Sequence, residues 1–382
     1  MKEEPITTQS AKNLKTEELK KKKKELEYLV SRYNNIQQTR KVQLNSAYGA
    51  FGNKHFRYYD VRIAGSVTLA GQYVTRKIDQ KINEYFNKIL KTQDHDYVVF
   101  SHTDSMYICL AGVVKQFFGE KKDLDPEVVV KALEKACSEK IYPKIKKILE
   151  EVSIYTNGLE NRMNMKIECI ADRGVWTGKN RYVLNVYYKE GTFYRHPFIK
   201  PVGIEVVKSS IPSVCRGKIM RALEIILREN EVNLRKFIRG FRKEYDEFSF
   251  EDIGIPIGIR RSIKGYDGSA EDKVYLKGTP KHIKGALVYN HQVKAHGLSK
   301  EYNTIKEGDK VKFLTLKLPN PIHETVISFP DVLPSEFGLE EYVDRDQMFL
   351  VSFMNPVNKV LSAVRWKLKE VATIESIFEK EV

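Results

Sequence analysis

The stretch from Asn13 to Phe51 constrains the fold more than any other, because it has no proline and no glycine before Gly49. It predicts one long helix or a close pair of helices, because apolar residues recur in it at helical spacing: Leu26, Leu29, Val30, Tyr33 and Ile36. A single helix of about 35 residues would be ~50 Å long and would therefore project as an arm instead of forming a core element.

The charge of the chain indicates what kind of partner it has. The formal net charge is +15 over 382 residues, which favours a polyanion, and nucleic acid is the usual one. An anionic membrane surface would require a basic amphipathic anchor, and the sequence has no convincing one. A solvated surface is the remaining interpretation. For the five consecutive lysines at 20–24, which would point all round a helix, a solvated face is the favoured interpretation and an electrostatic DNA contact is the alternative.

Several classes of protein are excluded by composition. The four cysteines show no metal-type spacing, which predicts a reduced, intracellular chain with small buried thiols: Cys109, Cys137, Cys169 and Cys215. No apolar stretch follows the first residues, so we expect no signal peptide. No run of about 18 apolar residues occurs, so we expect no membrane span.

Beyond the first helix, the hydrophobic pattern alternates between helix and strand. At about 150 residues per domain, the length predicts two or three domains. Helices are predicted at 56–93, 126–152, 213–230, 231–245 and 356–378, with short strands between 250 and 345. Two hairpins are predicted, Tyr97–Phe100 with Met106–Leu110 and Arg181–Tyr188 with Thr192–Phe198.

One face of the first predicted helix carries a distinctive set of side chains. At about 100° per residue, Lys41, Asn45 and Tyr48 fall within roughly 60° of one another. An ammonium, an amide and an aromatic ring suit a nucleoside triphosphate, because lysine attracts phosphate and tyrosine offers a flat surface to sugar and base. Gly49 and Gly52 permit close approach of a backbone or base pair. A polar surface stripe is the alternative.

The literal sequence adds a family resemblance. Asn45–Asn53 (NSAYGAFGN), with Lys41 before it and FRYYD after it, resembles motif B of family B DNA polymerases, in particular those of T-even-like tailed phages. In that family the helix belongs to the fingers. The resemblance implies that Lys41 contacts the triphosphate, that Asn45 and Tyr48 line the nascent base pair, and that Gly49 is also part of the nucleotide-binding face.

A second motif lies on the first predicted hairpin. Residues 100–105 (FSHTDS) resemble motif C, usually Tyr-Gly-Asp-Thr-Asp-Ser. The resemblance implies that Asp104 is the catalytic carboxylate and the ligand of two Mg²⁺ ions, and that Thr103 contributes to nucleotide binding. His102 replaces the first aspartate and is predicted to lie near the metals, but imidazole is a poor Mg²⁺ ligand, which predicts weakened catalysis. In isolation, Asp104 would be interpreted as a turn-capping residue.

Two further assignments come from the palm region. Lys179, Arg181 and Tyr182 resemble three residues of the Lys-Lys-Arg-Tyr motif, which rests against the primer-template, whereas Asn180 replaces the second lysine and predicts a weaker contact. Such minor-groove contacts check pair geometry without reading sequence. The alternative is a basic start to a surface strand. Glu168 stands where the family has an acidic residue near the metals, and a paired surface glutamate is the alternative.

From Lys200 onward the chain resembles the palm-to-thumb junction and the thumb. This implies DNA binding by Gly203, Glu205 and Lys284, in a region whose cations would grip phosphates independently of sequence. The tail has apolar residues at helical spacing: Ile374, Ile377 and Phe378. In related phage enzymes the extreme C-terminus docks on a sliding clamp, which predicts the same here. Packing of the tail on its own thumb is the alternative.

The resemblance covers roughly residues 30–382 and implies an α+β fold with a long fingers helix, an antiparallel-sheet palm with flanking helices, and a mostly helical thumb. The implied domains are 1–53 for the second fingers helix, 54–203 for the palm and 204–382 for the thumb with its tail. It also implies action in the cytoplasm of an infected bacterial host.

Motif A, an Asp-x-x-Ser-Leu-Tyr-Pro string in this family, does not occur in the sequence. One aspartate cannot hold two metal ions, so we expect the C-terminal subunit of a split polymerase. A separate N-terminal chain would carry motif A and the exonuclease and would share the Mg²⁺ ions, the dNTP and the primer-template DNA. A palm sheet without its motif A strand and a fingers helix without its antiparallel partner helix also predict an unpaired sheet edge and a large apolar interface. The alternative is a weakened or inactive primer-template-binding subunit.

Overall fold

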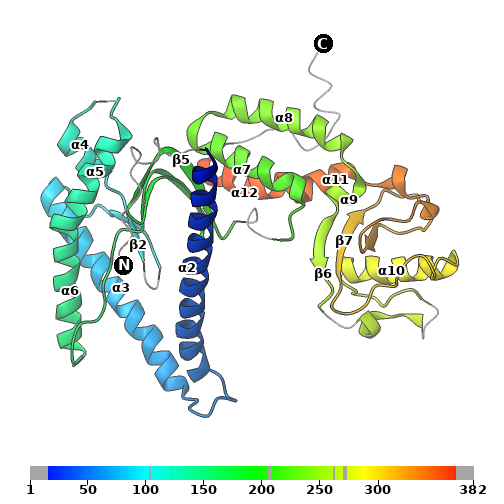
Figure 1. Cartoon of the computed structure of the whole chain (residues 1–382), viewed down its shortest axis with the longest axis horizontal. Helices are drawn as coiled ribbons and strands as arrows, with labels where there is room; N and C mark the ends of the chain where they lie inside the picture. The colour runs from blue at the N-terminus through cyan, green and yellow to red at the C-terminus, as the bar shows by residue number, and fades with distance from the viewer. Residues whose placement is uncertain are drawn as a thin grey trace. The chain divides into compact units, whose positions relative to one another are not determined.

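The computed structural model describes residues 16–102, 105–121, 123–204, 209–260, 263–269 and 273–366. The chain divides into two compact units: unit 1 is 1–120 with 140–165, and unit 2 is 121–139 with 166–382. Long helices and small antiparallel sheets occur together, which confirms the α+β prediction (Figure 1). The units divide the chain at other places than 53 and 203, so the three predicted domains stay predictions.

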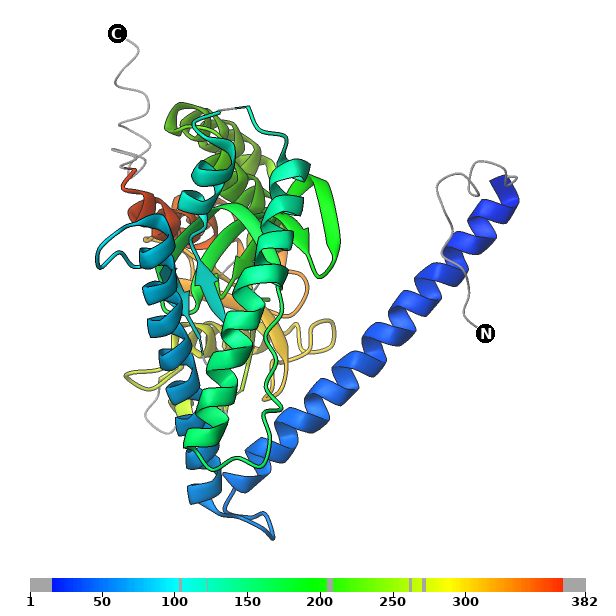
Figure 2. The ribbon, with the colours of Figure 1, turned by 90° about the vertical axis from the view of Figure 1, so that its left-hand side faces the viewer.

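Unit 1 begins with α2 (Thr16–Phe51), a single helix of 36 residues and not a helical pair. Figure 2 shows it as one uninterrupted helix. No residue of α2 is buried, which confirms the prediction of a long helix that lies outside the core of the unit. Glu17 and Glu18 in its first turn are favourably placed, because the amino end of a helix carries a partial positive charge.

The core of unit 1 lies between α3 (Val61–Leu90) and α6 (Tyr142–Tyr155). It consists of Val74, Ile78, Ile82 and Phe86 from α3 and of Ile145, Ile148, Leu149 and Val152 from α6. The core residues of α3 begin only at Val74. The large apolar side chains of its first part remain between 43% and 66% exposed: Val61, Ile63, Val67 and Leu69. The apolar surface of α3 is therefore only half covered.

The first predicted hairpin forms where expected. Strands β1 (Val98–Ser101) and β2 (Met106–Ile108) make a two-stranded antiparallel sheet. The Oδ1 atom of Asn83 on α3 accepts hydrogen bonds from the backbone of Tyr97 (2.8 Å) and Val98 (3.1 Å), which ties the hairpin to the helix. The helix that follows, α4 (Ala111–Phe118), was not predicted.

Unit 2 contains a three-stranded antiparallel sheet with β4 (Arg181–Lys189) between β3 (Cys169–Gly178) and β5 (Thr192–Val202). Most of β4 is buried, because α5 (Pro126–Ala136) and α7 (Ser213–Arg228) both contact it. The predicted hairpin of β4 and β5 is confirmed. The predicted helical segment 126–152 is confirmed: α5 continues through a π-helical turn, Cys137–Ile141, into α6.

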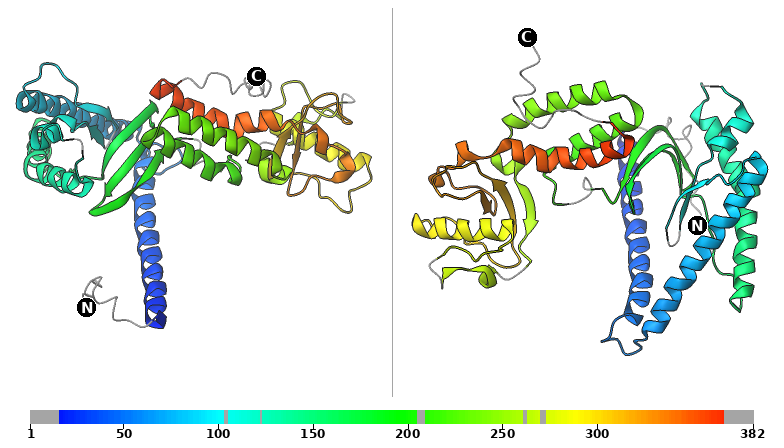
Figure 3. Two further views of the ribbon diagram at one scale, coloured as in Figure 1. Left: turned by 90° about the horizontal axis from the view of Figure 1, so that it is seen from above. Right: turned by 180° about the vertical axis from the view of Figure 1, so that it is seen from behind.

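The rest of unit 2 combines helices with a second small sheet. Its helices are α8 (Glu231–Glu247), α9 (Phe250–Ile253), α10 (Lys281–Ala295), α11 (Arg345–Phe349) and α12 (Asn355–Val364), with a π-helical turn at Leu350–Met354. Strands β6 (Ile255–Gly258), β7 (Lys310–Thr315) and β8 (Val326–Phe329) form the sheet, and 3₁₀ turns lie at Ile263–Tyr266, Ser335–Phe337 and Glu340–Tyr342. Figure 3 shows α12 alongside α7, and α10 beside the sheet.

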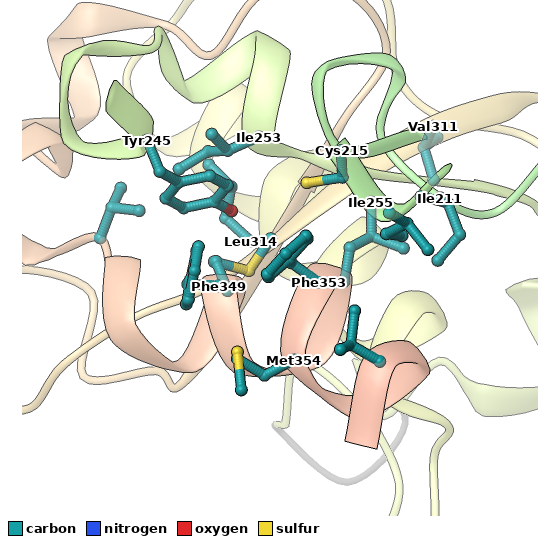
Figure 4. Close-up of a cluster of buried hydrophobic side chains, with 14 of the residues drawn as sticks. Ile211, Cys215, Tyr245, Ile253, Ile255, Val311, Leu314, Phe349, Phe353 and Met354 are labelled. Carbon is teal, nitrogen blue, oxygen red and sulfur yellow. The ribbon is translucent and has the colours of Figure 1, made fainter. Parts of the chain in front are cut away.

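One hydrophobic core holds these elements together (Figure 4). Phe353 packs edge-to-face on Phe241, and Tyr245 packs in the same way on Phe349. Burial raises the pKa of the Cys215 thiol to about 12, so it stays protonated as a small core residue. Cys137 is also buried, as predicted, but Cys109 is exposed. No helix among the described residues is long and apolar enough to cross a membrane.

Candidate functional site

The carboxyl end of α2 presents the predicted nucleotide-binding face. Because α2 is continuous, Lys41, Asn45 and Tyr48 lie on one side of it, and all three are exposed. The Tyr48 hydroxyl is hydrogen-bonded to Oγ1 of Thr68 on α3 at 2.7 Å. The Tyr48 ring is therefore fixed by its tip while 46% of the residue remains exposed. Among the described residues, no atom outside the helix's own neighbouring backbone lies within 4 Å of a Cβ built on Gly49, which leaves room for a ligand beside the backbone there.

The turn between α2 and α3 fixes the two helices to each other. The Asp60 backbone amide donates to the Phe51 carbonyl at 3.1 Å, which closes the turn. The Asp60 carboxylate accepts from the Arg62 side chain and from the Arg62 backbone amide, and so caps α3. These hydrogen bonds to Arg62 lower the pKa of Asp60 to about 2. The predicted nucleotide-binding face therefore lies next to a turn that is held by several hydrogen bonds. Contact with a nucleotide stays a prediction.

The predicted metal ligand belongs to the β1–β2 hairpin. The His102 amide donates to the Ser105 carbonyl at 2.7 Å and closes the turn, and the His102 side chain is exposed. Thr103 and Asp104 lie outside the described residues. Within the described part of the chain, no three His, Cys, Asp or Glu side chains come together as metal ligands. Because Asp104 is not among the described residues, the two-magnesium site stays a prediction.

The β3–β4 turn and the end of β5 meet at a close backbone contact. Lys179 and Arg181 are exposed there, and Asn180 between them has φ of 60°. Asparagine adopts this left-handed conformation more readily than lysine does, which gives a local reason for Asn180. Gly203 has φ of 65°, and a Cβ on it would lie 2.0 Å from the Asn180 carbonyl oxygen. Gly203 is thus part of the support for the basic turn.

Two other predicted palm residues have partners within unit 2. Tyr182 is 9% exposed, and its ring lies 6.0 Å from that of its cross-strand neighbour Trp176. The Glu168 carboxylate accepts a hydrogen bond from Nζ of Lys200 at 2.5 Å, which matches the alternative of a paired glutamate. The DNA contact of Tyr182 and the metal proximity of Glu168 stay predictions.

The predicted thumb residue Lys284 is engaged inside the protein. Its ammonium forms an ion pair with Glu324 at 2.7 Å, and it lies 4.6 Å from the centre of the Tyr275 ring. The side chains of Lys284 and Glu324 are 21% and 16% exposed, so a phosphate would compete with an established pair. Other predicted residues lie outside the described part of the chain: Glu205, Ile374, Ile377 and Phe378.

Comparison with known proteins agrees with these motifs. The family model for DNA polymerase family B matches residues 9–251, and the chain belongs to this family. It is 32% identical over 361 residues to the DNA-directed DNA polymerase of Enterobacteria phage T4 and 30% identical over 356 residues to that of Escherichia phage RB69. These matches cover 90% and 89% of the chain but only 39% and 38% of the relatives. The chain thus spans about two fifths of their length.

More distant relatives share less of the chain. It is 27% identical over 271 residues to DNA polymerase 1 of Aeropyrum pernix, a match that covers 67% of this chain and 22% of that protein. The family that the sequence motifs predicted is therefore confirmed, and so is the resemblance to T-even-like phage polymerases.

Proposed function

We propose that this chain is the C-terminal subunit of a split family B DNA-directed DNA polymerase, acting on primer-template DNA and dNTPs in the cytoplasm of an infected bacterium. One observation carries the proposal: Lys41, Asn45 and Tyr48 share an exposed face of α2, within the family match at 9–251. Lys41 would attract the triphosphate, and the anchored Tyr48 ring would support the sugar and base. Lys179 and Arg181, exposed at the β3–β4 turn, would contact the primer-template backbone.

Asp104 is the carboxylate that this chain would contribute to catalysis. Two bound Mg²⁺ ions would lower the pKa of the primer hydroxyl and stabilise charge on the leaving pyrophosphate. Because the chain has no motif A string, the second carboxylate would come from a complementing polypeptide. A docking of the C-terminal tail, with Ile374, Ile377 and Phe378, on a sliding clamp is part of the same proposal.

The exposed apolar surface of unit 1 supports a complementing polypeptide. Five α2 side chains fall within roughly 60° of one another at about 100° per residue. They are between 39% and 74% exposed: Leu19, Leu26, Val30, Tyr33 and Leu44. The first part of α3 also leaves apolar side chains exposed, and the β1–β2 sheet has only two strands among the described residues. Large exposed apolar surfaces mark interaction sites, and this one suits a partner helix.

A reconstituted complex tests the role of Asp104. With a polypeptide that carries motif A, we expect primer extension. Asp104→Ala and the near-isosteric Asp104→Asn should each reduce the rate of primer extension by more than roughly 100-fold. Loss of a residue that only supports a metal ligand costs up to about that factor. Primer-template binding, measured by fluorescence anisotropy, should stay unchanged. Glu190→Gln, at the exposed β4–β5 turn, is the control. Full extension by Asp104→Ala would show that this residue is not the metal ligand.

The second candidate is a primer-template-binding subunit without catalysis, and His102 favours it. An imidazole stands where the family has its first motif C aspartate, and imidazole is a poor Mg²⁺ ligand. A complex that binds primer-template but never extends it would support this candidate. The substitution His102→Asp then separates the two: gain of extension identifies a weakened active site, and no gain identifies a binding subunit.

The partner surface is tested by charge substitution on α2. Leu26→Glu and Tyr33→Glu place charges in the apolar stripe and should weaken binding of the complementing polypeptide in isothermal titration calorimetry. Tyr28→Glu is the matched control, because Tyr28 is 66% exposed and lies about 200° round the helix from Leu26. Equal effects of all three changes would contradict the assignment of the stripe. Primer extension by the chain without any complement would contradict the split enzyme itself.

A further inference from the structure

A buried polar side chain lies in the middle of the palm sheet. Asn185 on β4 is 2% exposed, and its neighbours Leu184 and Val186 are buried apolar residues. The Oδ1 atom of Asn185 accepts two hydrogen bonds from Arg228, the last residue of α7, from Nη2 at 2.7 Å and from Nε at 3.0 Å. Its Nδ2 atom donates to Oδ1 of Asp172 on β3 at 2.7 Å. Asn185 therefore joins a neighbouring strand to the end of a helix.

Further directional bonds hold the last turn of α7 on the same sheet. Nη2 of Arg228 also donates to the carbonyl of Pro197 on β5 at 2.5 Å, and Nη1 donates to Glu224. Arg173 on β3 donates from Nη1 to the Leu227 carbonyl at 2.8 Å. This bond satisfies a carbonyl that the helix end leaves unpaired. All three strands of the sheet are thus bonded to one helical turn.

Such a network is a poor way to gain stability. Asn185 is buried and the Arg228 side chain is 29% exposed, so their hydrogen bonds must first recover a desolvation cost, and apolar replacements of similar volume are often neutral or stabilising. The network does, however, permit only one placement of α7, because its hydrogen bonds are directional and the guanidinium fork is planar. Apolar contacts alone would allow the helix to slide along the sheet. The α8 and α12 helices pack on α7, so their placement follows from its own.

We propose that Arg228 and Asn185 form a positioning latch, which fixes α7 on the sheet and thereby places α8 relative to the basic β3–β4 turn. Neither residue needs to touch DNA for this role. Their effect on primer-template binding rests on the proposed function, whereas the fixed distance between the turn and α8 does not. The two can therefore be tested apart.

The test is a pulsed electron-spin distance measurement on the full chain. Spin labels are attached at Lys179→Cys on the turn and Lys236→Cys on the exposed face of α8, with Cys109→Ser and Cys169→Ser as background. We expect one narrow distance distribution in this labelled background. The double change Asn185→Leu with Arg228→Met should leave the thermal unfolding midpoint equal or higher, yet broaden or shift the distribution. If the two residues only stabilised the fold, the unfolding midpoint and the distance distribution would change together.

Glu231→Leu with Arg235→Met removes an ion pair that lies within α8 and should not change the distribution. Arg228→Lys keeps the charge but loses the fork, so it should broaden the distribution more mildly, and it keeps the test decisive if the double variant does not fold. An unchanged distribution in both Arg228 variants would overturn the latch.

A DNA-binding measurement adds the functional consequence. The double variant should bind primer-template more weakly but with an unchanged slope of log K against log salt, because the latch neutralises no phosphate. Lys179→Ala should instead lower the slope by about 0.9. If the unmodified chain and its complex bind no primer-template, the proposed function fails while the distance result still decides the latch. Unaltered affinity in a double variant with a broadened distance would overturn the link between latch and DNA.

Discussion

The close approach of Gly203 to the β3–β4 turn gives the sharpest stability prediction. Replacing Gly203 by alanine introduces two separate costs. First, φ of 65° is a left-handed conformation, which costs a residue with a Cβ about 1–2 kcal/mol. Second, the new Cβ would lie 2.0 Å from the Asn180 carbonyl oxygen and 3.1 Å from its carbon. Both neighbours are backbone atoms, so the whole turn must move.

The second cost is that of an overpacked contact, about 1–3 kcal/mol. The free energy of unfolding of unit 2 should therefore fall by about 2–5 kcal/mol in Gly203→Ala, the sum of the two costs. Gly191, at the other end of the sheet, provides a matched control. It also has a positive φ, 91°, but nothing lies within 4 Å of its added Cβ. Gly191→Ala should therefore cost only the conformational part, about 1–2 kcal/mol.

Urea unfolding monitored by tryptophan fluorescence measures both variants, because Trp176 lies on β3 beside the affected turn. The difference between the two alanine variants isolates the contact between Gly203 and Asn180. Gly203→Ala should also weaken primer-template binding, since Lys179 and Arg181 move with the turn. If both variants lose the same stability, the contact does not constrain the turn, and the assignment of Gly203 as its support is wrong.

Three other residues give predictions that need no DNA or only a short duplex. Carbon-13 NMR should give the Asp60 carboxyl a pKa of about 2, and in Arg62→Ala this pKa should lie nearer the ordinary value of 3.8. The stabilisation from the Asp60 cap is therefore complete above pH 3.8 and is lost as the pH falls through about 2. Phe353→Ala should cost about 3–5 kcal/mol in urea unfolding, because this core ring is fully buried. Lys284→Met should destabilise the chain by leaving Glu324 unpaired, yet leave the salt slope of duplex binding unchanged; a slope lower by about 0.9 would restore Lys284 as a phosphate contact.

Local patterns were enough to predict the long helix and the hairpins. The predicted helix at 13–51 and the strand at 181–188 match α2 and β4 closely, since periodicity of apolar residues is a local property. Helix α10 is not among the predicted helices, and Gly285 lies within it. A Cβ on Gly285 would lie 2.6 Å from Oγ of Ser328 on the adjacent strand. Only the packing of helix on sheet explains that glycine, and sequence spacing carries no sign of it.

In the candidate site, too, local features follow from the sequence, whereas contacts between separate elements do not. The shared face of Lys41, Asn45 and Tyr48 follows from helical geometry, but the bond from Tyr48 to Thr68 joins residues of two helices and could not be predicted. The motif resemblance makes Asn180 the replacement of a lysine, whereas its positive φ gives a backbone reason for asparagine. Asn185 was not singled out, although a polar residue inside the apolar run Val183–Tyr188 is a signal that the sequence does contain.

The distribution of buried residues bears on how the predicted nucleotide-binding face would be linked to the proposed complementing polypeptide. Unit 2 has a continuous core, whereas α2, which carries Lys41 and Tyr48, has no buried residue. Elements with few buried contacts open at low free-energy cost, so a polypeptide that covers the α2 stripe would also order the nucleotide-binding face. Binding free energies are reciprocal: whatever factor the complement adds to dNTP affinity, dNTP must add to complement affinity. In the proposed split enzyme, nucleotide binding and subunit assembly are therefore one coupled equilibrium.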